Sequence, residues 1–521
     1  MPLTSNSLAA AVGSSVQNAQ FQPAAQNVPR KILIIGTYDP LKLTIVDETP
    51  VQVFSPEDAG DKFGFGYMVH RLAVQAFKGS NGIETFIQPQ SEAGGAVAAA
   101  GEIDYTGSTG ILAGTIYLYI AGIAVPIAVT AAMTIEQLAD ATVAAITANK
   151  DLPVTAVKVA ITFEVTITAK SKGPWGNDIS IEFNLGVQQE LPAGVITTVT
   201  EMASGAGIPS MQDALDGLGT GDDANEAFFT GGVHGYGQDT TTLDAISTYV
   251  GEGNDFVGLY SKTVGRPFRV LTGDVAAGTG GLTALQAIAD ARKLDRANGI
   301  IAVPGSQNHP SEIAALAIGI MERINQDRAA QSYIDLLLSG IWPGAKADRW
   351  TSQYDNRDIA VKGGISPTKI KSDDVFMQNV VTFYRPDSVP VESNGYRSMR
   401  NISILQNIID NVRRNFAAEK WQGISIVANV SAVGNTLDRQ KARDVSAVID
   451  DLVALTKDFE DHAWIFEAAF TIDQLKIPGA VTIRPGAIGF DNILSVILSG
   501  EGGILDTVTQ FDTSIAVLTT A

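Results

Sequence analysis

Apolar residues recur at helical spacing in two stretches near the end of the chain. The first stretch predicts a helix that ends at Gly423, with an apolar stripe formed by Leu405, Ile409, Val412 and Phe416. A second helix is expected to begin near Asp438, with a buried stripe formed by Val445, Val448, Ile449, Leu452, Leu455 and Phe459. β-Rich runs accompany these helices at 375–384, 424–430, 463–471 and 481–483. The alternation predicts a compact α/β module over residues 373–500.

The first two thirds of the chain also alternate between strand and helix patterns. An apolar run at 32–35, a helix over 68–77 and a strand over 83–87 open the fold. Further elements are expected at 224–229, 245–249, 256–260, 284–292, 299–303 and 312–325. This alternation predicts a mainly parallel sheet in a domain of two parts, residues 30–102 and 187–342. Residues 343–372, rich in Gly, Pro and charge, are expected to form an irregular connection.

Residues 103–186 differ in texture from the domain around them. The run 111–133 carries no charge and is long enough to span a bilayer. However, Ala121-Gly122 divides it into two β-branched and aromatic runs, and Pro126 lies in the second, which favours a buried β-hairpin. A helix over 135–149 and strands over 154–167 and 179–183 follow. The stretch predicts an inserted β-rich domain.

Both ends of the chain are poor in core-forming residues. Residues 1–29 are rich in Ser, Asn, Gln and Ala, and they lack the basic start and dense apolar centre of a signal peptide. Residues 501–521 end in a strand-like run without a partner of its own. A disordered tail is the plain interpretation of the first segment.

Composition and charge narrow the function. The 521 residues are 45% hydrophobic and 18% charged, which is typical of a globular protein of several domains. The net charge of -20 disfavours nucleic acid and anionic membranes as partners, because phosphate binding requires clustered Lys and Arg. With no cysteine in the chain, disulfides, thiolate metal ligands and cysteine nucleophiles are excluded.

The sequence shows no pattern of a catalytic, cofactor or metal site. Four histidines lack ligand spacing: His70, His234, His309 and His462. Glycine-rich loops at 217–221 and 278–281 lack the Lys-Ser/Thr of a P-loop. Pairs of adjacent acidic residues are typical of solvated faces. We therefore expect no enzyme activity, cofactor or metal, with an α/β enzyme of unrecognised site in 197–342 as the alternative.

One charge arrangement favours a binding role. The second C-terminal helix is expected to carry three cations in its first two turns, where the helix dipole disfavours each by roughly 0.3–1 kcal/mol: Arg439, Lys441 and Arg443. On the preceding helix, polar residues recur every seven positions opposite the apolar stripe: Arg400, Asn407 and Arg414. Such residues on an acidic chain suggest a contact with a more acidic partner, although an ordinary solubilising face explains them equally well.

Several longer runs resemble the tail sheath proteins of contractile-tailed bacteriophages. They are FGFGYMVHRLAVQAF (63–77), GIETFIQPQSEAGGAVAAAGEI (82–103), GTIYLYIAGIAVPIAVTAAMTIEQLADATVAAI (114–146), KGPWGNDISI (172–181), ISPTKI (365–370), VTFYRP (381–386) and NISILQNIIDNVRRNF (401–416). The resemblance covers most of the chain in the right order. It implies a structural protein without enzyme activity, whose subunits form stacked six-fold rings around an inner tail tube.

The resemblance also implies roles for the parts of this chain. It implies a tail-sheath-like α/β core, an inserted domain on the outside, and a C-terminal core (373–500) that faces the tube. Residues 1–29 and 501–521 would be arms that add strands to neighbouring subunits, with contacts at Leu3, Leu8, Val12, Val16, Ile515 and Val517. Tube-facing contacts are expected at Arg400, Arg414, Arg439 and Arg443.

The expected partners are other copies of the chain, the inner tail tube protein, and baseplate and tail terminator proteins, with no direct nucleic-acid contact and no membrane insertion. The chain would be assembled in the host cytoplasm and located in the virion tail. Contraction would be a one-way change from a kinetically trapped array to a more tightly packed one, driving the tube through the host envelope during genome ejection. A sheath of a phage-tail-like bacteriocin or secretion system is the alternative within this class.

Overall fold

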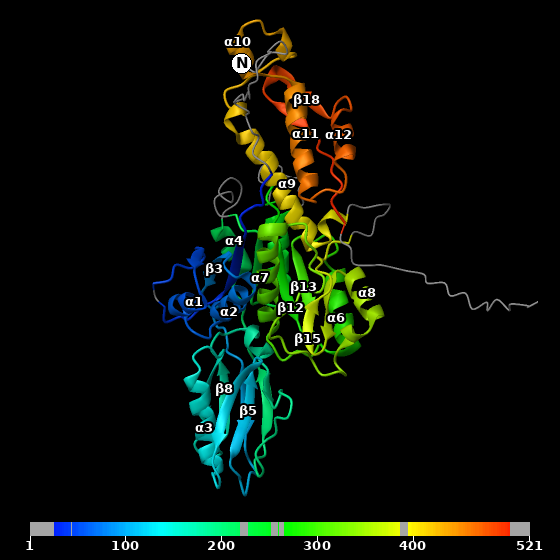
Figure 1. Ribbon diagram of the computed structural model, residues 1–521. Helices are drawn as coiled ribbons and strands as arrows, with labels where there is room; N and C mark the ends of the chain where they lie inside the picture. Colours follow the sequence, from blue (N-terminus) through cyan, green and yellow to red (C-terminus); the bar gives the residue numbers. More distant parts are fainter. Residues whose placement is uncertain are drawn as a thin grey trace, which may run out of the picture. The chain divides into compact units, whose positions relative to one another are not determined.

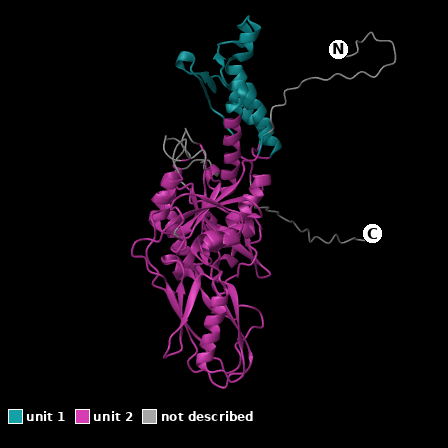
Figure 2. Cartoon of the chain, turned by 90° about the vertical axis from the view of Figure 1, so that its left-hand side faces the viewer, with its two compact units in different colours: residues 1–26, 415–462, 467–496 teal, residues 27–414, 463–466, 497–521 magenta. Residues whose placement is uncertain are grey.

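The computed structural model describes residues 25–42, 44–218, 228–251, 259, 265–385 and 394–500. The chain divides into two compact units (Figure 2). Unit 1 comprises residues 1–26, 415–462 and 467–496, and unit 2 comprises residues 27–414, 463–466 and 497–521. Some predictions lie outside the described residues: the element at 256–260 apart from Leu259, most of the element at 224–229, and the arm contacts Leu3, Leu8, Val12, Val16, Ile515 and Val517.

Unit 2 is built on an eight-stranded sheet. Its strands are β1 (Lys31–Thr37), β2 (Val51–Val53), β3 (Glu84–Gln90), β11 (Gly231–His234), β12 (Val270–Asp274), β13 (Asn298–Ala302), β14 (Ile365–Lys371) and β15 (Asp374–Met377). Their order is β15-β14-β13-β12-β11-β1-β3-β2. All neighbours from β14 to β3 are parallel, whereas the edge strands β15 and β2 are antiparallel to theirs. The predicted mainly parallel sheet is confirmed.

Helices cover both faces of this sheet, so its central strands are buried along almost their whole length (Figure 1). α2 (Met68–Ser80) and α7 (Pro310–Arg328) pack together on one face, and α1 (Pro56–Phe63) packs against α2. The other face carries α4 (Met211–Gly217), α5 (Thr240–Val250), α6 (Gly278–Asp290) and α8 (Tyr354–Lys362). α2 and α7 cross at Gly79 and Gly319. A Cβ at either glycine would lie 2.5 Å from a backbone oxygen of the other helix, so the crossing requires glycine on both.

Between β3 and α4, unit 2 contains two smaller antiparallel sheets. Their elements are β4 (Ala100–Asp104), β5 (Gly114–Ile120), β6 (Ile123–Val129), α3 (Ile135–Ala148), β7 (Val154–Lys158), β8 (Val165–Ala169), β9 (Ile181–Phe183) and β10 (Thr198–Ala203). One sheet has the order β10-β4-β8-β7 and the other β6-β5-β9, and α3 packs against both. A capping box starts α3, because Gln137 N donates to Thr134 Oγ1 at 3.2 Å and Thr134 N donates to Gln137 Oε1 at 2.9 Å.

The hairpin predicted for 111–133 is confirmed. β5 and β6 pair along their whole length and are joined by Ala121 and Gly122, with φ of 50° and 74°. Two positive φ angles give the two-residue turn whose twist matches that of paired strands. The strand predicted over 154–167 is wrong in extent, since it is a second hairpin of β7 and β8. No helix in the described part of the chain is long and apolar enough to cross a bilayer.

Unit 1 is a small helical unit with two short sheets. The unit boundary falls inside α9 (Met399–Ala417), after Arg414. The remaining elements are β16 (Ser425–Ile426), α10 (Thr436–Lys441), β17 (Ala442–Arg443), α11 (Val445–Asp461), α12 (Ala468–Leu475), β18 (Val481–Ile483) and β19 (Phe490–Asn492). β16 pairs with β17 and β18 pairs with β19. Its core contains Val448, Leu452, Leu475 and Val481, with Phe416, Trp421 and Phe490 half-buried around them.

Three predictions in the C-terminal third are wrong. The run 463–471, expected as a strand, contains the start of α12. The helix expected from near Asp438 is two helices, because α11 begins anew at Asp444, whose carboxylate accepts from Ala447 N at 3.2 Å. The expected irregular connection 343–372 contains α8 and β14. The proline at 367 disfavours an interior strand in the sequence, yet it pairs with Ala302 inside the large sheet.

Candidate functional site

The carboxyl edge of the parallel sheet contains the crevice at which folds of this kind bind ligands. Doubly wound sheets bind ligands where the strand order reverses, which in unit 2 is between β1 and β11. This crevice is filled by Met68 from the start of α2. A Cβ at Gly36 would lie 2.7 Å from Met68 Sδ, and one at Gly235 would clash with the same sulfur. Thr37 Oγ1 lies 3.9 Å from that sulfur, so the chain occupies its own crevice.

The polar groups around this crevice also have partners within the chain. At the start of α2, Met68 N donates to Ser171 Oγ at 2.9 Å, and Gly66 N donates to His70 Nδ1 at 2.9 Å. Tyr236 is buried after β11 and donates to Gln90 Oε1 at 2.8 Å. Burial lowers the pKa of both His70 and His234 to about 4, so both are neutral at pH 7. Both imidazoles are therefore uncharged, and Met68 N at the start of α2 is already bound within the chain.

The two remaining histidines, His309 and His462, also contact groups of the chain itself. His309 caps the N-terminus of α7, accepts from Ser311 N at 3.2 Å and lies 2.8 Å from Trp175 O through Nε2. His462 ends α11, with Nδ1 2.7 Å from Asp458 O. Across the described residues, no group of three or more His, Asp and Glu side chains is placed to hold a metal ion.

The structure separates the four arginines that were expected to face the tube. Arg400 is 2% exposed. Its Nε donates to Ala330 O at 2.7 Å, and its Nη1 and Nη2 donate to Ser499 O and Oγ, both at 2.8 Å. Asn407 is fully buried as well. An exposed face through Arg400 and Asn407 is therefore wrong.

The reason lies in which side of α9 is buried. Its polar side faces the interior of unit 2, where Asn407 Oδ1 accepts from Val28 N at 3.0 Å and from Arg30 Nη2 at 2.8 Å. The expected apolar stripe is only half-buried over Leu405, Ile409 and Val412. The buried side of α9 thus combines polar residues with apolar ones, and the stripe predicted from hydrophobic periodicity is not the one that is most buried; the buried residues include Arg400, Gln406, Asn407, Ile402, Ile404 and Ile408.

The other three arginines keep more exposure but differ in role. Arg414 has a 42% exposed side chain and pairs with Asp410 one turn earlier, Nε to Oδ2 at 2.6 Å. Arg439 is exposed, and its Nε donates to Val433 O at 2.8 Å. Arg439 and Lys441 lie in the last turn of α10, so the expected dipole cost is wrong and the dipole favours them.

Arg443 holds unit 1 together. Its guanidinium donates to the carbonyls of Gln440, Ala442 and Lys420 at 2.8–2.9 Å, and its Cζ lies 5.8 Å from the ring centroid of Trp421. Trp421 Nε1 in turn donates to Asp451 Oδ2 at 2.7 Å. A side chain with three carbonyl partners has few donors left for another protein.

Unit 1 also carries a hairpin with open edges, formed by β18 and β19. Ile493 N donates to Ala480 O at 2.8 Å, and Arg484 N donates to Gly489 O at 2.9 Å. The backbone groups of these four residues therefore point toward the opposite strand of the hairpin. Because antiparallel pairs alternate, the N–H and C=O groups of four intervening residues point outward: Val481, Ile483, Phe490 and Asn492. Among the described residues no third strand covers either edge.

The surroundings of this hairpin suit the addition of a strand. Large aliphatic side chains beside it are exposed: Ile477 at 51%, Ile488 at 80% and Ile493 at 66%. A two-stranded ladder of three residues per strand is marginal by itself, and open edges with adjacent apolar surface are sites of strand pairing. The hairpin was expected only as a strand at 481–483, and the open edges became visible only with the pairing.

Part of the chain is similar in sequence to a known protein. No family model matches the chain. A stretch of 190 residues is 33% identical to the Mu-like prophage FluMu tail sheath protein of Haemophilus influenzae, which covers 36% of this chain and 38% of that protein. The chain thus matches well under half the length of this curated relative. The resemblance to tail sheath proteins is confirmed over the matched stretch.

Solved structures with similar chains give a weaker likeness. The sheath tail protein of Desulfitobacterium hafniense is 12% identical with a TM-score of 0.42, covering 91% of this chain and 94% of that one. The contracted PVC sheath complex of an extracellular contractile injection system is 8% identical with a TM-score of 0.46, covering 98% and 99%. The contracted helical sheath of the anti-feeding prophage is 8% identical with a TM-score of 0.41, covering 97% and 100%. Scores this low do not by themselves establish a shared fold.

Proposed function

Starting from the 190 residues shared with a tail sheath protein, we propose that this chain is a structural subunit of a contractile tail sheath. Subunits would polymerise as stacked six-fold rings around an inner tail tube and contract to drive that tube through the host envelope during genome delivery. The sequence match is the observation that carries the proposal. The open hairpin of unit 1 supports it, because a polymer needs unsatisfied pairing surface on each subunit.

The open edges of β18 and β19 are the proposed sites of linkage between subunits. Residues 1–29 and 501–521 are the proposed arms, with contacts at Leu3, Leu8, Val12, Val16, Ile515 and Val517. An added strand supplies main-chain hydrogen bonds to Val481 and Ile483 or to Phe490 and Asn492, which have outward-facing groups. The exposed isoleucines beside the hairpin would cover the apolar side chains of the incoming strand.

The proposed source of work is new surface buried between subunits during contraction. Burying about 1,000 Å² more apolar surface per subunit corresponds to roughly 25 kcal/mol before entropic and polar costs. No nucleotide hydrolysis is then needed, and the proposal includes no enzyme activity and no cofactor. The packed crevice at the carboxyl edge of the sheet is compatible with this, since Met68 fills the place of a ligand.

The proposed contact with the tube protein involves fewer arginines than the four that the sequence suggested. Arg414 and Arg439 are exposed enough to meet an acidic partner, whereas Arg400 and Arg443 donate to carbonyls of their own units. Baseplate and tail terminator proteins, assembly in the host cytoplasm and a final place in the virion tail belong to the same proposal. Charge reversal at Arg439 should weaken co-assembly with the tube and leave unit 1 folded.

The first test is negative-stain electron microscopy of the purified chain beside a version without residues 1–20. We expect striated tubes or rings from the intact chain and dispersed particles from the truncated one. As a control away from the hairpin, Lys362→Gln changes an exposed lysine of α8 that pairs with Asp358 one turn earlier, and it should assemble normally. If the intact chain stays monomeric with and without the tube protein, the sheath proposal is refuted.

A further inference from the structure

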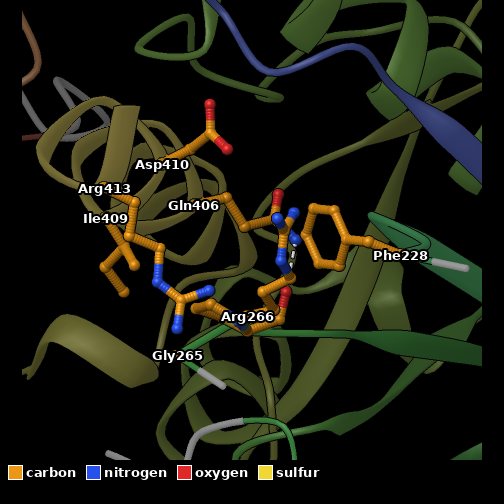
Figure 3. A pocket seen from close by; sticks show the side chains of 8 residues that line it. Phe228, Gly265, Arg266, Gln406, Ile409, Asp410 and Arg413 are labelled. Atoms are coloured by element: carbon orange, nitrogen blue, oxygen red, sulfur yellow. Dashed lines mark hydrogen bonds between the residues drawn. The ribbon is translucent and has the colours of Figure 1, made fainter. Parts of the chain in front are cut away.

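The small pocket beside α9 in unit 2 has room for about one water molecule (Figure 3). Arg266, Asp410 and Arg413 line it together, so groups of both charges already come from the chain itself. Gln406, another lining residue, donates through Nε2 to Pro267 O at 2.6 Å. The pocket is therefore a packed part of the fold.

A chemically reactive pair of residues lies at the end of α2, where Asn81 is followed by Gly82. Asn81 caps the helix in the left-handed conformation, with φ of 46° and ψ of 53°, and its N–H donates to Phe77 O. Gly82 has φ of 105°, and both residues are exposed. In an Asn-Gly sequence the backbone nitrogen of the glycine can attack the side-chain amide, because glycine has no side chain to hinder the approach.

The fold leaves both reacting groups of this pair open. Among the residues that the structure describes, neither the carboxamide of Asn81 nor the N–H of Gly82 has a hydrogen-bond partner. A Cβ placed at Gly82 would meet no atom within 4 Å, so no neighbouring group restricts the backbone there. Helix ends open at little cost in free energy, and such opening lets Gly82 N reach Asn81 Cγ.

The same dipeptide occurs in the core, where the fold locks it. Asn298 and Gly299 lie in β13 and, like the first pair, are followed by Ile. Asn298 is fully buried, and its Nδ2 donates to Leu243 O at 3.1 Å and to Asp295 Oδ2 at 2.7 Å. The main chain of β13 is paired on both sides, with β12 and with β14. Reaction at Asn298 therefore requires the central strands to open.

We propose that Asn81 is a site of spontaneous deamidation, which converts it to aspartate and isoaspartate in the folded chain. Gly82 N attacks Asn81 Cγ, the N–Cγ bond forms, the Cγ–Nδ2 bond breaks, and ammonia leaves with the proton from Gly82 N. Water then adds to one of the two carbonyl carbons of the resulting succinimide ring and opens it. No electrons are transferred, and the modification is independent of the proposed function, because it needs only the folded chain and water.

The product alters the junction between α2 and β3. Isoaspartate carries the main chain through the former side chain, which adds a backbone carbon between two fixed points. On one side Gly79 is in close contact with Gly319 of α7, and on the other side Glu84 pairs with Lys31 of β1. The new carboxylate also lies at the C-terminal end of a helix, where the dipole disfavours negative charge. We therefore expect the modified chain to be less stable than the unmodified one.

Ageing of the full chain at mildly alkaline pH tests the proposal. Peptide mapping by mass spectrometry, with digestion at acid pH, follows Asn81 and Asn298 in the same molecules, folded or unfolded in guanidinium chloride. In the unfolded chain the two should convert at similar rates, because the residues that follow them are the same. In the folded chain we expect Asn81 to stay within about ten-fold of its unfolded rate and Asn298 to be at least about 100-fold slower, since helix ends open far more readily than core strands.

A third pair, Asn394-Gly395, adjoins residues outside the described part of the chain, and its peptide is scored separately. Equal protection of Asn81 and Asn298 in the folded chain overturns the proposal. Equal conversion of both in the folded chain overturns it as well, because the fold would then not distinguish the open pair from the locked one.

The variant Asn81→Gly separates this modification from other effects of ageing. Glycine keeps the left-handed conformation at the end of α2 and removes the amide, so the variant should fold and its urea midpoint should fall less on ageing than that of the unchanged chain. An equal fall in both overturns the assigned loss of stability. Electron microscopy of the same samples reports on sheath assembly separately. A chain that deamidates at Asn81 but never forms tubes would keep this inference and refute the sheath.

Discussion

The crossing of α2 and α7 makes a sharp test of how unit 2 is packed. Gly79 and Gly319 touch at this crossing, and a Cβ on Gly79 would lie 2.5 Å from Leu316 O and 2.9 Å from Ile320 N. On Gly319 it would lie 2.5 Å from Ala76 O. These are backbone atoms of buried helices and cannot rotate away. Alanine at either position must therefore push the two helices apart.

The expected size follows from two opposing terms. Overpacking of this kind costs about 1–3 kcal/mol, and replacing glycine by alanine inside a helix returns about 1 kcal/mol. We expect Gly79→Ala and Gly319→Ala each to lower the free energy of unfolding by about 0–2 kcal/mol. The double variant should cost less than the sum, because the first alanine already separates the helices and makes room for the second.

Urea unfolding followed by tryptophan fluorescence measures these changes. Gly280→Ala is the matched control: it is also helical, in α6, but a Cβ there meets no atom within 4 Å. It should raise the free energy of unfolding by about 0.5–1 kcal/mol through helix propensity alone. The close crossing is wrong if Gly79→Ala and Gly280→Ala stabilise the chain equally.

Three further outcomes follow from the buried polar groups. Glu322→Ala leaves the fully buried Arg269 without its carboxylate and should cost about 3–5 kcal/mol in urea unfolding; a loss under about 1 kcal/mol contradicts the buried pair. Burial lowers the pKa of His234 from 6.5 to about 4, so its stabilising effect is present above pH 6.5 and lost as the pH falls toward 4. His234→Asn should remove up to about 3 kcal/mol of the pH dependence of unfolding between pH 7 and 4, and an unchanged profile would refute the assignment. Arg443→Gln should lower thermal stability by about 1–3 kcal/mol, whereas Arg439→Gln should change it by less than about 0.5 kcal/mol; equal effects would contradict their different roles.

Local sequence patterns predicted the secondary structure well where residues close together in the chain determine it. The turn at Ala121-Gly122 predicted the hairpin of β5 and β6, because two left-handed residues between apolar runs leave few other conformations. Helices with strong periodicity were found close to their expected bounds, as for α2 and α3. The alternation of elements predicted a parallel sheet with helices on both faces.

The wrong predictions concern elements whose secondary structure depends on residues distant in the chain. β14 carries a proline and is polar at its end, and it becomes a sheet strand because β13 and β15 flank it. The two-residue strands β16 and β17 divide what periodicity predicts as one helix, since their pairing brings residues 425–426 beside 442–443. A local pattern holds no information on such partners.

The candidate site likewise has some features that the sequence determines and others that only the tertiary structure determines. The sequence by itself determined the acidic charge, the absence of cysteine and known catalytic motifs, the resemblance to sheath proteins and the type of most elements. Only the tertiary structure decided that Arg400 is buried, that Arg443 binds carbonyls and that β18 and β19 keep open edges among the described residues. The physical reason is that burial and pairing depend on which segments the fold brings together, from 23 positions apart for Arg443 and Lys420 to hundreds for α9. Arg30 and Asn407, 377 residues apart, turn the polar side of α9 inward and thereby decide which arginines can meet another protein.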